Sequence, residues 1–154
     1  MFLLAVDLGV RTGLALYGSD GRLVWYRSKN FGSAARLKRG VKAVLDEITG
    51  LERLIIEGGG DLAEIWESEA EWRGVELRQI SAADWRTQFL HPREQRSGSQ
   101  AKRVADELAR RVIDWSGAAR PTSLRHDAAE AILVGLWGVL EAGWLDQLPS
   151  ELRR

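Results

Sequence analysis

The sequence predicts an α/β protein with a mixed five-stranded sheet and helices on both of its faces. Three strand-like segments come first, at residues 2–8, 14–18 and 23–29, and an Asp-Gly pair between the second and third indicates a hairpin. Two later strand-like segments, 53–57 and 75–80, alternate with segments of helical period. That alternation is typical of crossovers between parallel strands, so the sheet should combine both strand directions.

The expected helices follow from apolar spacing and from residues that favour helix ends. They cover residues 33–49, 61–73, 81–90, about 99–115 and about 126–145. The last of them is apolar nearly all round, which predicts a buried helix. Residues 91–100, HPREQRSGSQ, are polar and contain glycine, and we expect a mobile loop there.

The composition excludes several classes of protein. A length of 154 residues fits one domain, which we place at residues 1–154. The chain has no cysteine, so it can form neither a disulfide framework nor a thiolate zinc site, and this suits an intracellular protein. No charge-free apolar stretch approaches the roughly 20 residues that span a bilayer. We expect no membrane association.

Charge is segregated along the chain although the formal net charge is zero. Between Arg27 and Lys42 there are six basic residues and no acidic one, and between Arg86 and Arg111 there are seven basic residues against three acidic. A protein that binds nucleic acid needs positive charge only on its contact face. Two solvated helix faces would give the same pattern, so both interpretations stay open here.

Four carboxylates occupy places where burial should exclude them: Asp7, Glu57, Asp127 and Glu130. Each alone could cap a turn, form a salt bridge or complement a helix dipole. Four uncompensated carboxylates near a core are costly unless they converge on a cation. Ligands that are all oxygen favour Mg²⁺ or Mn²⁺, and a pair of such ions can cleave a phosphodiester. We expect Gly9 and Gly13 to let the backbone turn tightly around Asp7.

Three segments together resemble a known family: AVDLGVRTGLAL, LIIEGG and HDAAEAILVGLWG, in this order and at these distances. They are similar to the RuvC family of Holliday junction resolvases, which have a ribonuclease H-like fold, and the resemblance covers nearly the whole chain. It implies four acidic ligands for two Mg²⁺ or Mn²⁺ ions, here Asp7, Glu57, Asp127 and Glu130. Glu130 stands where cellular members usually have aspartate, which resembles the compact phage-encoded branch.

The resemblance also implies an activity and a setting for it. The family are homodimeric endonucleases that make paired symmetric nicks in four-way DNA junctions. Such a protein would be cytoplasmic, in the host cytoplasm if it is phage-encoded. The sequence leaves open whether a helicase partner exists.

Several further residues of this chain are candidates for the DNA-contacting surface. By resemblance, Arg86 stands where the family usually has a lysine, and Lys102 lies near the position of a second family lysine. The other phosphate-contact candidates are Arg93, Arg96 and Arg103. His126, beside Asp127, is a candidate proton shuttle, and an ordinary histidine at a helix start is the alternative.

The family often places an aromatic wedge soon after the second carboxylate, but glycines occupy residues 58–60 here. The wedge is therefore absent, or it is supplied by Trp66, Phe89 or His91. Trp66 and Trp72 share a helix, which could line a dimer interface or pack on the sheet.

Three alternative functions have to be weighed against junction resolution. An ATP-binding protein built around Asp-Leu-Gly needs a second domain, for which this chain is too short. A nuclease of the same fold could act on other branched DNA or on RNA–DNA hybrids. A non-catalytic junction-binding module would gain by losing negative charge near phosphates, so the four carboxylates argue against it.

Overall fold

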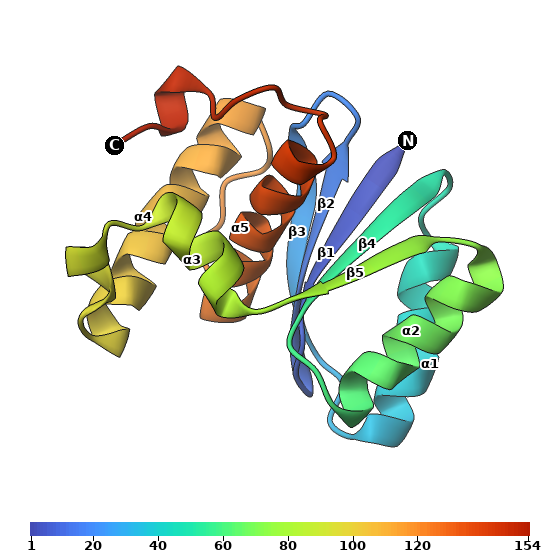
Figure 1. Ribbon diagram of the computed structural model, residues 1–154. Helices are drawn as coiled ribbons and strands as arrows, with labels where there is room; N and C mark the ends of the chain where they lie inside the picture. The colour runs from blue at the N-terminus through green and yellow to red at the C-terminus, as the bar shows by residue number, and fades with distance from the viewer.

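The computed structural model describes residues 1–154 and has one sheet between two layers of helices (Figure 1). The strands are β1 (Phe2–Asp7), β2 (Arg11–Gly18), β3 (Leu23–Asn30), β4 (Leu51–Glu57) and β5 (Glu76–Ile80). They lie in the order β3-β2-β1-β4-β5. The β1–β2 and β2–β3 pairs are antiparallel, whereas β4 is parallel to both β1 and β5. The predicted mixed five-stranded sheet is confirmed.

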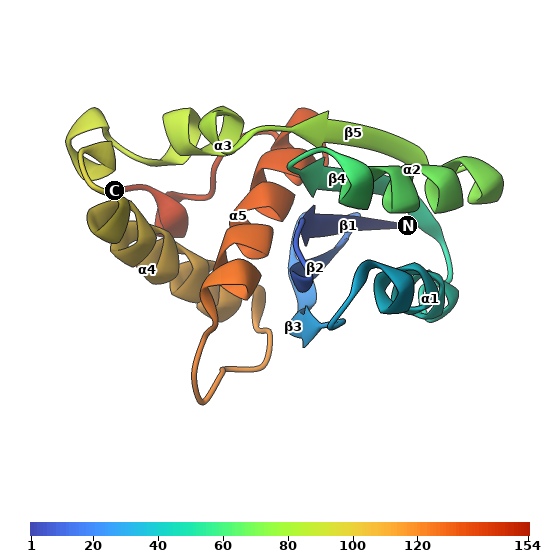
Figure 2. The same ribbon diagram turned by 90° about the horizontal axis from the view of Figure 1, so that it is seen from below.

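Different helices cover the two faces of the sheet (Figure 2). One face of the sheet is covered by α1 (Ala34–Asp46) and α2 (Asp61–Arg73). The other carries α3 (Ala82–Phe89), α4 (Gly98–Ser116) and α5 (His126–Glu141). Two 3-10 helices complete the chain, η1 (Pro92–Gln95) and η2 (Ser150–Leu152). No helix is both long and apolar enough to cross a membrane.

Several element boundaries differ from the sequence-based expectation: β2 begins at Arg11 rather than at residue 14, and α1 ends at Asp46 rather than at residue 49. The last helix ends at Glu141 rather than near Leu145, because Gly143 adopts a left-handed conformation with φ of +75°. The expected loop at 91–100 contains η1, and α4 already begins at Gly98. The carboxylate of Glu94 orders this segment: it accepts from the backbone N–H of His91 at 2.8 Å.

The same Glu94 carboxylate is held by an arginine far along the chain. Arg154 donates from Nη1 to Glu94 Oε2 at 2.6 Å, and only about a tenth of the glutamate side chain is exposed. The partners lie 60 residues apart, so a local pattern could not show this contact.

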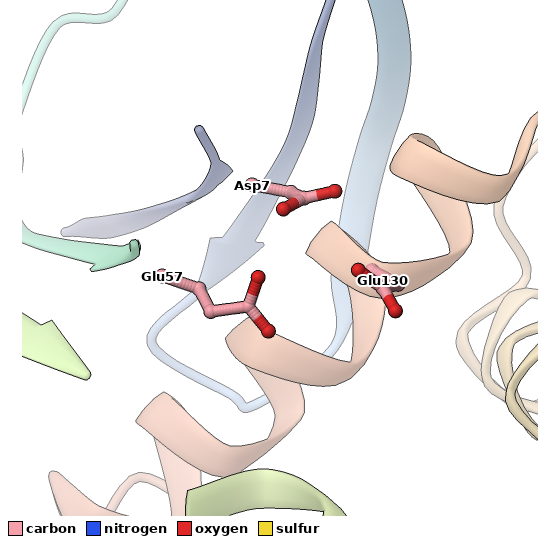
Figure 3. A group of neighbouring side chains, drawn as sticks. All are labelled: Asp7, Glu57 and Glu130. Atoms are coloured by element: carbon pink, nitrogen blue, oxygen red, sulfur yellow. The ribbon is translucent and has the colours of Figure 1, made fainter. Parts of the chain in front are cut away.

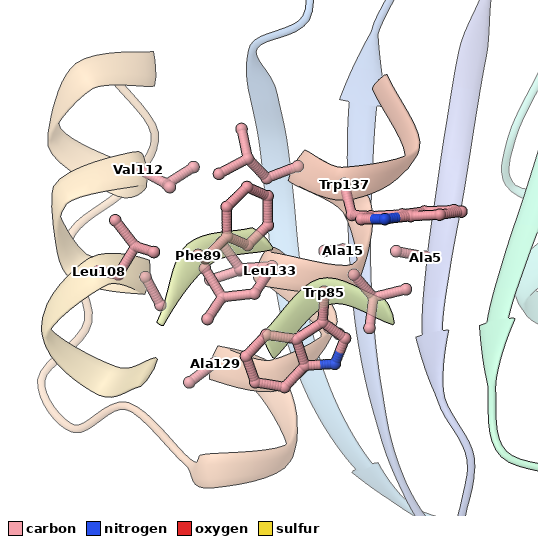
Figure 4. Close-up of a cluster of buried hydrophobic side chains, with 14 of the residues drawn as sticks. Ala5, Ala15, Trp85, Phe89, Leu108, Val112, Ala129, Leu133 and Trp137 are labelled. Atoms are coloured by element: carbon pink, nitrogen blue, oxygen red, sulfur yellow. The ribbon is translucent and has the colours of Figure 1, made fainter. Parts of the chain in front are cut away.

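Strand alternation divides the core into two clusters. Leu4 and Val6 of β1 face α1 and α2, whereas Leu3 and Ala5 face α5. The larger cluster joins α3, α4 and α5 to the sheet, with Trp85, Phe89, Leu108, Leu133 and Trp137 among its members (Figure 4). As predicted, α5 is buried on nearly every side.

Helix α5 lies unusually close to the strands because glycines occupy its contact positions. A Cβ on Gly135 would lie 2.2 Å from the ring of Tyr17, and a Cβ on Gly13 would lie 1.9 Å from the Asp127 carbonyl oxygen. Gly13 therefore sits inside β2 to admit the start of α5, and the expectation that it serves a turn is wrong. Gly9 does serve the turn, since its Cβ would lie 2.5 Å from the Arg11 carbonyl oxygen.

Candidate metal centre and nucleic-acid interface

Three of the four predicted carboxylates converge at one end of the sheet (Figure 3). Asp7 ends β1, and its register partner Glu57 ends the neighbouring parallel strand β4, so both side chains project from the same face. Glu130 faces them from the second turn of α5. One carboxylate oxygen from each residue lies within 4.8 Å of the others.

This convergence is electrostatically unfavourable without a cation. Burial raises the pKa of Asp7 well above its usual range, and the carboxylates of Glu57, Glu130 and Asp127 raise it further. A divalent cation would reverse the shift by stabilising the ionised forms. Three oxygen donors this close suit a hard ion, so the residues present fit Mg²⁺ or Mn²⁺.

The fourth predicted carboxylate, Asp127, is oriented differently. Its Oδ2 accepts from the Ser28 hydroxyl at 2.9 Å, and its Oδ1 accepts from the backbone N–H of Ala128 at 2.9 Å. It lies outside the group of three, although its charge still acts on Asp7. Its role as a metal ligand stays a prediction. Ser28, which holds it, was missed by the sequence analysis.

Trp85 is a second residue at the site that sequence reasoning missed. Its indole Nε1 donates to Glu57 Oε1 at 2.8 Å, and its side chain is fully buried in α3. A buried indole N–H needs an acceptor. The sequence could therefore predict that Trp85 has an acceptor, but not that the acceptor is Glu57. The bond orients the Glu57 carboxylate.

Two predicted accessory residues meet on the same oxygen of Glu130. Arg86 donates from Nη2 to Glu130 Oε1 at 3.0 Å, and His126 Nε2 lies 3.1 Å from that oxygen. The Arg86 guanidinium also lies over the ring of Trp85. Arg86 Nε is buried and has no hydrogen-bond partner, whereas 33% of the side chain as a whole is exposed.

The remaining candidates for DNA contact lie beyond the carboxylate group. Arg93 is in η1, Arg96 directly follows it, and Lys102 and Arg103 belong to the start of α4. All four are exposed, and none forms an ion pair within 4.0 Å. Solvated, unpaired cations of this kind are available for phosphates, but the structure brings none of them into the group of carboxylates.

Burial excludes two of the three candidate wedges. Trp66 is fully buried and Phe89 is 7% exposed, because both side chains belong to the core clusters. His91 is exposed. Trp66 packs on the sheet, whereas Trp72 on the same helix is 80% exposed.

Comparison with known proteins identifies the fold. No protein-family model matches the sequence, and no curated protein is similar to it. The structure is similar to RuvC of T. thermophilus, solved in complex with a Holliday junction substrate: the TM-score is 0.65 at 16% identity, over 93% of this chain and 96% of RuvC. The chain has a ribonuclease H-like fold.

A second solved structure is less similar to this ribonuclease H-like chain. The catalytic core domain of BIV integrase gives a TM-score of 0.38 at 14% identity, over 86% of this chain and 80% of that domain. The similarity to RuvC extends over nearly the whole of both chains and, at 16% identity, is a similarity of fold.

Proposed function

We propose that this chain is a Mg²⁺- or Mn²⁺-dependent endonuclease that cuts four-way DNA junctions. The observation that carries the proposal is the convergence of Asp7, Glu57 and Glu130 from three separate elements to within 4.8 Å. Carboxylates gathered this closely repel one another, whereas a metal-dependent nuclease uses such a group to hold its ions. The ribonuclease H-like fold places them on a rigid sheet and a buried helix.

The three converging carboxylates would hold the metal, with Asp127 as a fourth ligand once it releases Ser28. We propose two ions for each site. When bound, such ions supply a deprotonated water at neutral pH and stabilise the charge on the phosphodiester oxygens.

Neighbouring side chains have separate tasks in this proposal. Trp85 holds the Glu57 carboxylate in place through its 2.8 Å hydrogen bond. Arg86, a third of whose side chain is exposed, contacts a non-bridging phosphate oxygen while Nη2 stays on Glu130. His126, with 38% of its side chain exposed at the edge of the group, holds a proton for the leaving 3′ oxygen.

Branched DNA is the proposed substrate for two reasons. The four unpaired cations at 93–103 can contact phosphates in any sequence. The RuvC structure similar to this chain was solved with a Holliday junction. A four-way junction has two equivalent strands to cut, so we propose a homodimer that makes paired symmetric nicks, leaving 5′-phosphate and 3′-hydroxyl ends.

The first experiment compares substrates and a variant that removes one carboxylate charge. Purified protein is incubated with a labelled mobile four-way junction, a flap, a duplex and an RNA–DNA hybrid, each with Mg²⁺ and with Mn²⁺. We expect symmetric nicks confined to the junction. Asp7→Asn should reduce the rate by at least about 1,000-fold, equivalent to about 4 kcal/mol in the barrier.

The control is Glu52→Gln, an exposed acid of β4 without an ion pair, which should cut at the wild-type rate. If the protein also cuts flaps and hybrids, the conclusion would be that it is a nuclease with a broader range of substrates than four-way junctions. Tight junction binding without cutting under either metal would leave a binding module and contradict the enzyme proposal.

A further inference from the structure

Four of the six cations in the first basic segment found in the sequence form one exposed surface in the structure. Four cations lie on the outer side of α1 and are here called the basic α1 face: Arg36, Lys38, Arg39 and Lys42. The buried side of the same helix is formed by aliphatic residues, among them Leu37 and Val41. None of the proposed catalytic or metal-binding residues belongs to this helix.

The basic α1 face is electrostatically costly for the helix itself. Arg36 lies in the first turn, where a cation opposes the helix dipole, and no acidic residue is present there to offset it. Arg36 and Arg39 are three residues apart, and Lys38 and Lys42 are four apart, so like charges are neighbours on the helix surface. A binding partner of opposite charge outside the chain would offset this repulsion between the cations and with the helix dipole.

Internal acids do not neutralise this face. None of its four cations lies within 4.0 Å of a carboxylate, although α2 alongside carries Asp61, Glu64, Glu67, Glu69 and Glu71. The acids near the end of α1 pair with other residues, Asp46 with Arg73 and Glu47 with Arg27. Eight other arginines of the chain do have carboxylate partners: Arg27, Arg53, Arg73, Arg78, Arg86, Arg110, Arg120 and Arg154.

The start of α1 lies at the same end of the sheet as the carboxylate group (Figure 1). The backbone N–H of Phe31, which leads into α1, donates to the Val10 carbonyl at 2.9 Å, three residues after Asp7. In Figure 2, α1 lies on one side of the sheet and η1 with the start of α4 on the other, while the end of β1 lies between them. The carboxylates are therefore flanked by two separate sets of unpaired cations.

We infer that the basic α1 face binds the phosphate backbone of a second DNA arm, while residues 93–103 bind the first. The inference rests on the proposed function and adds to it a second arm-binding surface. Arg36, Arg39 and Lys42 follow one another at intervals of three residues and span roughly 9 Å along the helix. One strand of duplex presents about three phosphates over that length, which matches three cations.

The test measures binding rather than cutting, in EDTA, by fluorescence anisotropy over a series of salt concentrations. The variant Arg36→Gln/Arg39→Gln/Lys42→Gln keeps good helix formers at all three positions. We expect its affinity for a four-way junction to fall by about 10- to 100-fold. The slope of log affinity against log salt should decrease by about 2.7, since each lost phosphate contact contributes roughly 0.9.

A linear duplex of the length of one arm provides the decisive comparison. It can occupy the 93–103 surface alone, so the triple variant should lose less than about 3-fold in duplex affinity. Arg93→Gln/Arg96→Gln should weaken junction and duplex to a similar extent. Equal losses on both substrates in the α1 variant, or no loss on either, would overturn the inference.

Two controls separate phosphate binding from structural effects. Arg22→Gln/Arg53→Gln/Arg78→Gln changes the net charge by the same three units outside both surfaces and should preserve junction affinity within about 3-fold. Arg36→Lys/Arg39→Lys keeps the charges and should retain most of the binding, because lysine serves a phosphate as a point charge. Loss of binding in the lysine variant at full thermal stability would contradict the inference.

Other outcomes distinguish this inference from the function on which it rests. If the wild-type protein binds the junction no better than the duplex and does not cut it, the proposed function fails. If the wild type prefers the junction and the triple variant keeps that preference, only the inference about α1 fails. If sedimentation shows that the triple variant dissociates a dimer, α1 contacts a second copy of the chain, and the inference is again overturned.

Discussion

The two faces of the sheet use the same strands for different purposes. Leu4 and Val6 of β1 pack under α1 and α2 in one hydrophobic cluster. Leu3 and Ala5 of the same strand pack under α5, and the next residue in that alternation is Asp7. A carboxylate can be held on the second face because glycines let a helix approach closely there. The sheet face under α1 and α2 therefore contributes stability, and the face under α3–α5 contributes stability and holds the carboxylate group; the cations inferred to bind DNA lie on the outer surface of α1, away from the sheet.

The largest expected change in stability tests the α1–α2 face. Trp66→Ala should lower the free energy of unfolding by about 3–5 kcal/mol, because the indole is fully buried against the sheet. Urea unfolding measures the loss, and cutting per folded molecule should stay unchanged. Trp72→Ala on the same helix is the control and should change stability by less than about 0.5 kcal/mol, since Trp72 is 80% exposed. Loss of cutting in a fully folded Trp66→Ala protein would show that the core under α1 and α2 also positions the carboxylate group.

Gly13→Ala tests the close approach of α5. A Cβ there would lie 1.9 Å from the Asp127 carbonyl oxygen, so the start of α5 must shift. We expect a loss of about 2–3 kcal/mol in stability and at least about 100-fold in cutting, because Glu130 moves with the helix. Gly98→Ala is the control, since a Cβ at Gly98 meets nothing within 4 Å. A folded Gly13→Ala protein that cuts at the wild-type rate would show that the close approach does not position Glu130.

Glu94→Gln tests whether the segment before α4 depends on its ion pair. Arg154 lowers the pKa of Glu94 from 4.5 to about 2, so the ionised form is favoured in the folded state. At pH 7 we expect a loss of about 2 kcal/mol in the free energy of unfolding. A depressed pKa contributes stability that is present above pH 4.5 and is lost as the pH falls towards 2.

Wild type and the Glu94 variant should therefore become more alike in urea unfolding at pH 3 than at pH 7. Glu47→Gln removes an exposed ion pair with Arg27 and serves as the control, with a much smaller change. A difference between wild type and Glu94→Gln that is the same at both pH values would exclude the ion pair as its cause.

The smallest effect expected is a gain. Without divalent metal, Asp7→Asn should raise Tm by about 2–4 °C, equivalent to about 1 kcal/mol, because it removes a half-buried carboxylate that lies within 4.8 Å of two others. The folded-state pKa of Asp7 is raised from 3.8 to about 9, so the wild type loses stability as the pH rises through this interval. The Asp7→Asn variant should lose less stability over the same pH interval. Thermal unfolding in EDTA measures both effects, and added Mg²⁺ should stabilise the wild type alone.

Much of the fold and part of the site could be predicted from local sequence patterns. Alternation and turn residues indicated the strands, and the apolar run at 126–145 indicated a buried helix, because these patterns report the period and burial of one element at a time. Asp7 and Glu57 were recognisable as carboxylates at the ends of buried strands. The place of Arg86 beside Glu130, by contrast, depends on how α3 meets α5.

The sequence by itself determined which residue types and which strand faces were available for the carboxylate group. The tertiary structure alone decided which side chains complete it: Trp85 on Glu57, Ser28 on Asp127, and three carboxylates rather than four within 4.8 Å. It also decided that Glu94 meets Arg154 and that α1 lies on the opposite side of the sheet from η1 and the start of α4. The physical reason is range: periodicity and capping act over a few residues, whereas these contacts join residues far apart in the chain and form only when the elements pack.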